Sequence, residues 1–155
     1  MKIADGELRQ ILTYDVKIAA DVVRELVADS KQTGNSLLYT VLQSKLVDEI
    51  VLAKAQAKRI GVPFIDLDTA EPKPNVIQRI PREIAAKYHV ICFDETPTSI
   101  KLAMADPRNE RARQAVKEYT HKTVRRYQVT SYQLTRAMRG YSTSAPLPFS
   151  TRDLL

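Results

Sequence analysis

The chain has 155 residues, of which 44% are hydrophobic and 27% are charged, and its formal net charge is +6. These values are typical of a globular protein with one domain or two small subdomains, and they exclude a disordered, collagen-like or coiled-coil chain. No apolar run approaches the roughly eighteen residues that a transmembrane helix requires. Cys92 is the only cysteine, which excludes an internal disulfide and a multi-cysteine zinc site.

The positive charge is concentrated in the C-terminal half. Between Lys101 and Arg139 there are ten basic and three acidic residues, a net charge of +7, so the rest of the chain is close to neutral. A basic surface of this kind fits nucleic acid, acidic lipid or an acidic protein surface. It fits a solvated helix face equally well.

The first sixty residues predict four short helices in two similar pairs. Apolar residues recur there at helical spacing. Gly34 is placed to end one helix in the left-handed conformation, and Asn35 or Ser36 is placed to cap the next. Asp48 is expected to cap the last helix of this segment, which Gly61 ends.

The two helix pairs are related by a spacing of 29 residues, which indicates a tandem helical unit. Chance agreement between amphipathic helices is the alternative. Four of six compared pairs keep an apolar residue at both positions, and the pairs are Leu8/Leu37, Leu12/Val41, Val16/Lys45, Ile18/Val47, Val23/Leu52 and Val27/Gln56.

From Val62 onward the pattern changes to strands alternating with helices. We expect an α+β fold: an N-terminal tandem short-helix subdomain, then a small mixed sheet of three to four strands with helices packed on one face. The expected organisation is a helical subdomain at 1–60, an α/β subdomain at 61–141 and a flexible linker or tail at 142–155. The expected strands are Val62–Leu67, His89–Phe93, Ile100–Met104 and Val124–Val129, the middle two as a hairpin, with helices at Pro81–Tyr88, Asn109–Tyr119 and from Ser131 to near Gly140.

Motifs of catalysis are absent from the sequence. No two glycines lie close together, and no Walker A sequence or nucleophile elbow is present, so we expect no ATP hydrolysis by this chain, no catalytic residue and no cofactor. His89 and His121 are far apart and lack carboxylates at ligand spacing, so no metal is expected either. Cys92 lies in an apolar strand and is expected to be a buried, inert thiol.

Three segments carry a family resemblance. They are Gly61–Leu67 (GVPFIDL), Ile80–Tyr88 (IPREIAAKY) and Leu102–Asn109 (LAMADPRN). In this order and spacing, and together with the doubled helical unit, they resemble the N-terminal domain of type II secretion and type IV pilus assembly ATPases over residues 8–141. Physically they are fold devices, because Pro81 suits a first helical turn, Asp106 and Pro107 suit a turn, and Asn109 suits a helix N-cap.

The resemblance implies a non-catalytic docking and regulatory domain that precedes a hexameric ATPase core in the parent chain. Such a domain lies in the cytoplasm, peripheral to the bacterial inner membrane. It binds a cytoplasmic domain of an inner-membrane platform protein, or an actin-like adaptor. The candidate partner-binding residues on the basic face are Arg125, Arg126, Arg136 and Arg139.

Some domains of this family also bind cyclic di-GMP, through Arg-Leu-Gly at the start of each helical unit, a second glycine seven residues later and a terminal glutamine. Here both arginines, all four glycines and both glutamines are replaced. Glycine lets the backbone approach a ligand, and arginine stacks on bases and pairs with phosphate. We therefore expect no cyclic di-GMP binding through this motif, whose positions are Glu7, Leu8, Arg9, Val16 and Ser30 in the first unit and Ser36, Leu37, Leu38, Lys45 and Arg59 in the second.

Two other functions stay open. One is a sensor of a cyclic dinucleotide or another nucleotide, and the other is a nucleic-acid-binding module that uses the basic half. Nucleic acid is not the expected partner, because no strand carries an aromatic-rich RNA-binding signature. Salt-dependent binding to DNA or RNA would distinguish it, since phosphate binding releases counterions.

Overall fold

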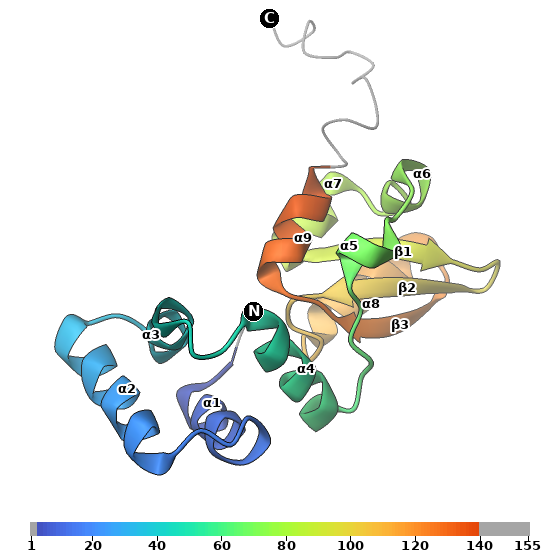
Figure 1. Ribbon diagram of the computed structural model, residues 1–155. Coiled ribbons are helices and arrows are strands. Elements are labelled where there is room, and N and C mark those ends of the chain that lie inside the picture. Colours follow the sequence, from blue (N-terminus) through green and yellow to red (C-terminus); the bar gives the residue numbers. More distant parts are fainter. Residues whose placement is uncertain (1–2, 140–155) are drawn as a thin grey trace, which may run out of the picture. The chain divides into compact units, whose positions relative to one another are not determined.

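The computed structural model describes residues 3–139, so the expected linker at 142–155 lies outside the described part (Figure 1). The chain divides into two compact units, Met1–Gly61 and Val62–Leu155. We call them the helical unit and the α/β unit. No helix in residues 3–139 is long and apolar enough to cross a membrane.

The helical unit has its own apolar core. Leu8, Leu12, Val41 and Leu52 are fully buried in it, so both halves of the 29-residue repeat contribute. The predicted helices are present, and the first continues into a π-helical turn. The elements are α1 (Asp5–Gln10), η1 (Ile11–Asp15), α2 (Ala20–Thr33), α3 (Leu37–Ser44) and α4 (Glu49–Ile60).

Helix ends in this unit are set by backbone at positive φ. Gly34 (φ 77°) ends α2 and Gly61 (φ 89°) ends α4, both in the left-handed conformation that the sequence predicts. The Oγ atom of Ser36 accepts a hydrogen bond from the backbone N–H of Tyr39 at 3.1 Å and so caps α3. Asp48 stands at the N-cap position of α4, but its side chain makes no cap hydrogen bond.

The two helical repeats match in sequence at a spacing of 29 residues. The left-handed residue that ends the first helix of each pair is, however, displaced by one position. Lys45 (φ 60°) ends α3 eight residues after Leu37, whereas the equivalent positive φ occurs at Lys17 (φ 63°), nine residues after Leu8. The π-helical turn accounts for the extra residue, because the N–H of Val16 bonds to the carbonyl of Ile11, five residues earlier, at 2.8 Å. Val16 itself therefore keeps a right-handed conformation, with φ −91°.

The α/β unit is built on a three-stranded mixed sheet in the order β1-β2-β3, which confirms the predicted α+β class. The hairpin pairs β1 and β2 antiparallel, with Val90 opposite Met104. The crossover through α8 then places β3 parallel to β2, with Ile100 opposite Val124. The elements are α5 (Leu67–Ala70), α6 (Pro74–Ile77), α7 (Arg82–Tyr88), β1 (Val90–Glu95), β2 (Ser99–Met104), α8 (Glu110–Thr120), β3 (Thr123–Gln128) and α9 (Ser131–Met138).

Helices cover both faces of this sheet, whereas the sequence predicts helices on one face only. Side chains alternate along a strand, so Ala103 and Leu102 of β2 belong to opposite faces and to two separate cores. Leu134 of α9 packs in the core of Ala103, and Val116 of α8 packs in the core of Leu102. Strands β1 and β2 carry buried apolar side chains on both sides, which is the mark of a sheet buried on both faces.

The predicted strand at Val62–Leu67 forms only an isolated parallel bridge. Phe64 pairs with Gln128, through a hydrogen bond from the N–H of Ile65 to the carbonyl of Gln128 at 2.9 Å. Pro63 has no N–H to donate, and Asp66 already caps α5 by accepting from the N–H of Asp68 at 3.0 Å. The segment therefore has no room to extend as a strand.

The landmark segments shape turns and helix starts. Pro81 stands at the N-cap position of α7. The Oδ1 atom of Asp106 accepts from the N–H of Arg108 at 3.3 Å, and that of Asn109 accepts from the N–H of Ala112 at 3.2 Å, which caps α8. These contacts fix the crossover between β2 and α8.

Substituting Lys45→Gly is expected to stabilise the chain by about 0.5–1 kcal/mol. Relief of the left-handed strain of a non-glycine residue, ~1–2 kcal/mol, exceeds the added backbone entropy of glycine, ~0.5–1 kcal/mol. The measurement is urea unfolding followed by circular dichroism. The control is Lys31→Gly, an exposed lysine inside α2, which should destabilise the chain by about 1 kcal/mol. Equal destabilisation by both substitutions would contradict the assigned backbone.

Candidate anion-binding site

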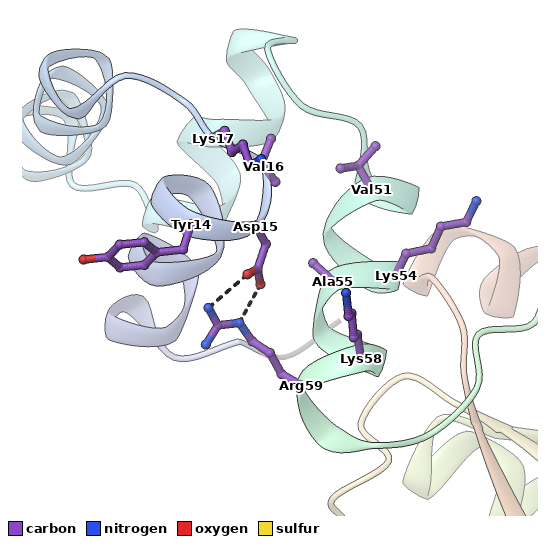
Figure 2. A pocket seen from close by; sticks show the side chains of 9 residues that line it. All are labelled: Tyr14, Asp15, Val16, Lys17, Val51, Lys54, Ala55, Lys58 and Arg59. Atoms are coloured by element: carbon purple, nitrogen blue, oxygen red, sulfur yellow. Dashed lines mark hydrogen bonds and ion pairs between the residues drawn. The ribbon is translucent and has the colours of Figure 1, made fainter.

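A pocket of about 550 Å³ opens within the helical unit (Figure 2). One wall comes from the π-helical turn η1 and the residues that follow it. The other wall is the exposed side of α4, whose lining positions recur at helical spacing. The lining residues are Tyr14, Asp15, Val16, Lys17, Val51, Lys54, Ala55, Lys58 and Arg59.

Cations dominate this lining. The lining includes four cations, Lys17, Lys54, Lys58 and Arg59, and one carboxylate, that of Asp15. Lys54 and Lys58 stand one helical turn apart on α4, and Lys17 follows η1 at its left-handed position. We call the pocket lined by these four cations, Asp15 and the apolar residues Val16, Val51 and Ala55 the cationic pocket. Its excess of positive charge favours an anionic ligand.

Asp15 and Arg59 hold the two walls together. Arg59 donates from Nε to Oδ2 of Asp15 at 2.6 Å and from Nη2 to Oδ1 at 3.3 Å, a paired geometry that Figure 2 shows. A third hydrogen bond runs from Nη1 of Arg59 to Oε1 of Gln10 at 3.3 Å. The hydrogen bond with Asp15 raises the pKa of Arg59 above its usual value. The guanidinium is therefore charged at neutral pH.

Two motif positions line the pocket, one in each wall. Val16, in place of the second glycine of the first unit, and Arg59, in place of the terminal glutamine of the second unit, both line the pocket. The backbone at Lys45 also keeps the left-handed conformation that suits the glycine of the motif. The residue types at the motif positions differ from those of the binding version of the domain. Two of these positions, Val16 and Arg59, nevertheless line a pocket.

The lysines of the pocket were not singled out from the sequence. Lys17, Lys54 and Lys58 fall in the half of the chain that is close to electrically neutral, so the charge distribution directs attention away from them. The available signal was the spacing of Lys54 and Lys58, which puts both on one exposed side of a helix.

The four predicted partner-binding arginines lie on β3 and on α9 and its end. Arg125 is exposed, and strand alternation puts Arg126 on the opposite face of the sheet. Arg126 donates from Nη1 to the carbonyl of Pro107 and to Oε1 of Glu110, both at 3.0 Å. Arg136 is paired with Asp68 at 3.2 Å, and Arg139 is exposed directly after α9. Their role in partner binding stays a prediction.

Cys92 is fully buried, and burial raises the pKa of its thiol to about 12, so the thiol stays protonated and unreactive. Among residues 3–139, no group of three or more histidine, cysteine or acidic side chains is placed to hold a metal ion.

Comparisons with known proteins identify the family. The MshEN domain model matches residues 60–146, more than half of the chain, and the chain belongs to this family. It is the N-terminal domain of type IV pilus and type II secretion ATPases, as the sequence resemblance implies.

Curated relatives include two type IV pilus assembly ATPases named PilB. The one from Myxococcus xanthus is 26% identical over 104 residues, and the one from Thermus thermophilus is 29% identical over 79 residues. These matches cover 67% and 51% of this chain but only 18% and 9% of the relatives. The chain therefore spans less than a fifth of the length of either relative.

Solved structures share the fold. MshE, determined with cdg (cyclic di-GMP), has a TM-score of 0.67 and 19% identity, and the match covers 86% of this chain and 97% of that one. The N-terminal domain of XpsE has a TM-score of 0.58 and 20% identity, with coverages of 90% and 98%. At this level of identity the likeness establishes the fold.

These findings correct the expectation that cyclic di-GMP is not a partner. The chain belongs to the MshEN family, and MshE, which shares its fold, was solved with this nucleotide. The expectation was wrong because it compared motif residues one by one. Lys17, Lys54 and Lys58 supply positive charge from positions outside the motif. Arg59 supplies it from a position where the motif has glutamine.

Glu110→Gln is expected to destabilise the chain slightly at pH 7 and less at low pH. The hydrogen bond from Arg113, with the charges of Arg113 and Arg126, lowers the pKa of Glu110 below its usual value. A lowered folded-state pKa stabilises the fold above pH 4.5, and this contribution is lost as the pH falls through the folded-state value. Thermal unfolding of both chains between pH 3.5 and 7 measures it.

The control is Glu83→Gln, which removes the same charge from the first turn of α7. It matches the loss of a favourable helix-terminus charge but removes no ion pair. A destabilisation by Glu110→Gln that is the same at every pH, or equal to that of Glu83→Gln, would contradict the assigned ion pairs.

Proposed function

We propose that this chain is the N-terminal regulatory domain of a pilus or secretion motor ATPase, and that its helical unit binds cyclic di-GMP in the cationic pocket. The observation that carries the proposal is the pocket itself, with four cations against one carboxylate. The MshE structure with cyclic di-GMP supports the site, because its match covers 86% of this chain, and the family match over residues 60–146 supports the motor-ATPase role.

The charges of the pocket match those of the ligand. A cyclic dinucleotide carries two phosphodiester groups, each with one negative charge. Lys54 and Lys58 lie one turn apart on α4, and Lys17 lies on the opposite wall, so both walls contribute cations that attract phosphate. Lysine binds phosphate as a point charge, whereas Arg59 can form two parallel hydrogen bonds with it.

The apolar part of the wall suits the bases. Val51 is 43% exposed although it is apolar, and Ala55 and Val16 line the pocket beside it. Aliphatic side chains provide a surface against which a base can bury its face. The pocket thus offers both contacts that a nucleotide requires.

Charge reversal at Lys54→Glu and Lys58→Glu together is expected to weaken cyclic di-GMP binding by about tenfold or more, because two favourable charges become repulsive. Isothermal titration calorimetry with the 155-residue chain is the measurement. The control is Arg24→Glu with Lys31→Glu, a matched double reversal on the exposed side of α2, outside the pocket.

If the variant with Lys54→Glu and Lys58→Glu bound cyclic di-GMP as well as the unsubstituted chain, the binding site would not be the cationic pocket. Absence of binding by the unsubstituted chain at millimolar ligand would overturn the sensor function itself.

A second candidate function is docking of the α/β unit onto a cytoplasmic domain of an inner-membrane platform protein, with the motor held at the membrane surface. Arg125 favours it. This residue is exposed on β3 and has no ion-pair partner within residues 3–139. A cation that is not used within the fold is available to an acidic partner.

Arg125→Glu is expected to weaken binding to that platform domain about three- to tenfold, with little effect on stability. Arg126 and Arg136 are poorer test positions, because their reversal also breaks ion pairs with Glu110 and Asp68. Surface plasmon resonance with the platform domain of the same organism measures the effect. Arg82→Glu, an exposed arginine of α7, is the control, and equal weakening by both variants would remove the assignment to β3.

A further inference from the structure

Asp15 is the one acidic residue among those that line the cationic pocket. An acid in a site for a phosphate-bearing ligand is unfavourable for binding, because the like charges repel. Attraction between opposite charges therefore does not explain why an acidic residue lines this pocket.

The geometry ties Asp15 to a single cation. Both of its carboxylate oxygens accept hydrogen bonds from Arg59, from Nε at 2.6 Å and from Nη2 at 3.3 Å. Asp15 belongs to η1 in the first helical repeat and Arg59 to the last turn of α4 in the second. The side chains are 32% and 28% exposed, so a ligand in the pocket can reach the pair.

A phosphate group and a carboxylate compete for the same face of a guanidinium. Each offers two oxygens at a spacing that matches two N–H donors. The Nε–Nη2 edge of Arg59 is occupied by Asp15, and its Nη1 atom donates to Gln10. A ligand phosphate that takes this edge has to displace the carboxylate.

We propose that Asp15 is a selectivity residue of the pocket, which holds Arg59 in an ion pair and admits a ligand fully only when a phosphate replaces the carboxylate. The inference rests on the proposed function, since it concerns the same pocket. Neutral ligands leave the pair intact and gain no contact with Arg59. A cyclic dinucleotide exchanges the pair for a phosphate contact and thereby releases η1 from the end of α4.

The test measures cyclic di-GMP binding by the 155-residue chain and four variants. Asp15→Asn removes the repulsion and weakens the hold on Arg59, so binding is expected to tighten about three- to tenfold. Asp21→Asn removes the same charge from the first turn of α2, outside the pocket, and should leave binding unchanged. Circular dichroism melting checks that each variant is folded.

The double variant Asp15→Asn with Arg59→Gln shows whether the gain acts through Arg59. The proposal expects it to bind no more tightly than Arg59→Gln alone. A gain that persists without Arg59, or equal or weaker binding by Asp15→Asn, would overturn the selectivity role and leave the proposed function standing.

Guanosine provides a ligand without phosphate. Its binding should not respond to Asp15→Asn, and a gain as large as that for cyclic di-GMP would overturn the displacement of the carboxylate. Failure of cyclic di-GMP to bind the unsubstituted chain and all variants would overturn the proposed function and this inference together.

Discussion

The helical unit depends on where its backbone takes a positive φ. Lys17, Gly34, Lys45 and Gly61 hold this conformation, and each lies at or just after the end of a helix. A left-handed residue stops the helical hydrogen-bond ladder and redirects the chain, so these four positions fix which apolar faces meet. Two of them are lysines, which adopt the conformation at a cost that glycine avoids.

The cationic pocket follows from the first of these positions. The π-helical turn before Lys17 delays the chain reversal by one residue, relative to the second repeat. The turn leaves Asp15, Val16 and Lys17 as one wall of the pocket. The Asp15–Arg59 ion pair then joins that wall to α4 across 44 residues of sequence. A deviation from the regular repeat thus lies beside the proposed site, and π-turns are frequent at functional sites.

Much of the fold could be predicted from local signals. Gly34 and Gly61 mark helix ends, Ser36 marks a cap, and the apolar runs of β1 and β2 predict a hairpin. These signals act within a few residues of chain. The π-helical turn gives no comparable signal, because Ile11–Asp15 continue an ordinary amphipathic pattern.

The rest could not be predicted, because it depends on contacts between distant segments. Helices on both faces of the sheet follow from crossovers that periodicity does not specify. The family resemblance is borne out by the MshEN match, yet its motif misled the expectation for cyclic di-GMP. A motif compares residue types at fixed positions, whereas binding depends on which charges the fold gathers. Lys17 and Lys58 are 41 positions apart and meet at one pocket.

The proposed nucleotide site is the cationic pocket of the helical unit. The most direct measurement is a two-dimensional NMR titration of the ¹⁵N-labelled 155-residue chain with cyclic di-GMP. Binding in this pocket is expected to give chemical-shift changes concentrated at 14–17 and 51–59, with much smaller changes at β3 and α8. Changes concentrated in the α/β unit, or none at saturating ligand, would contradict it.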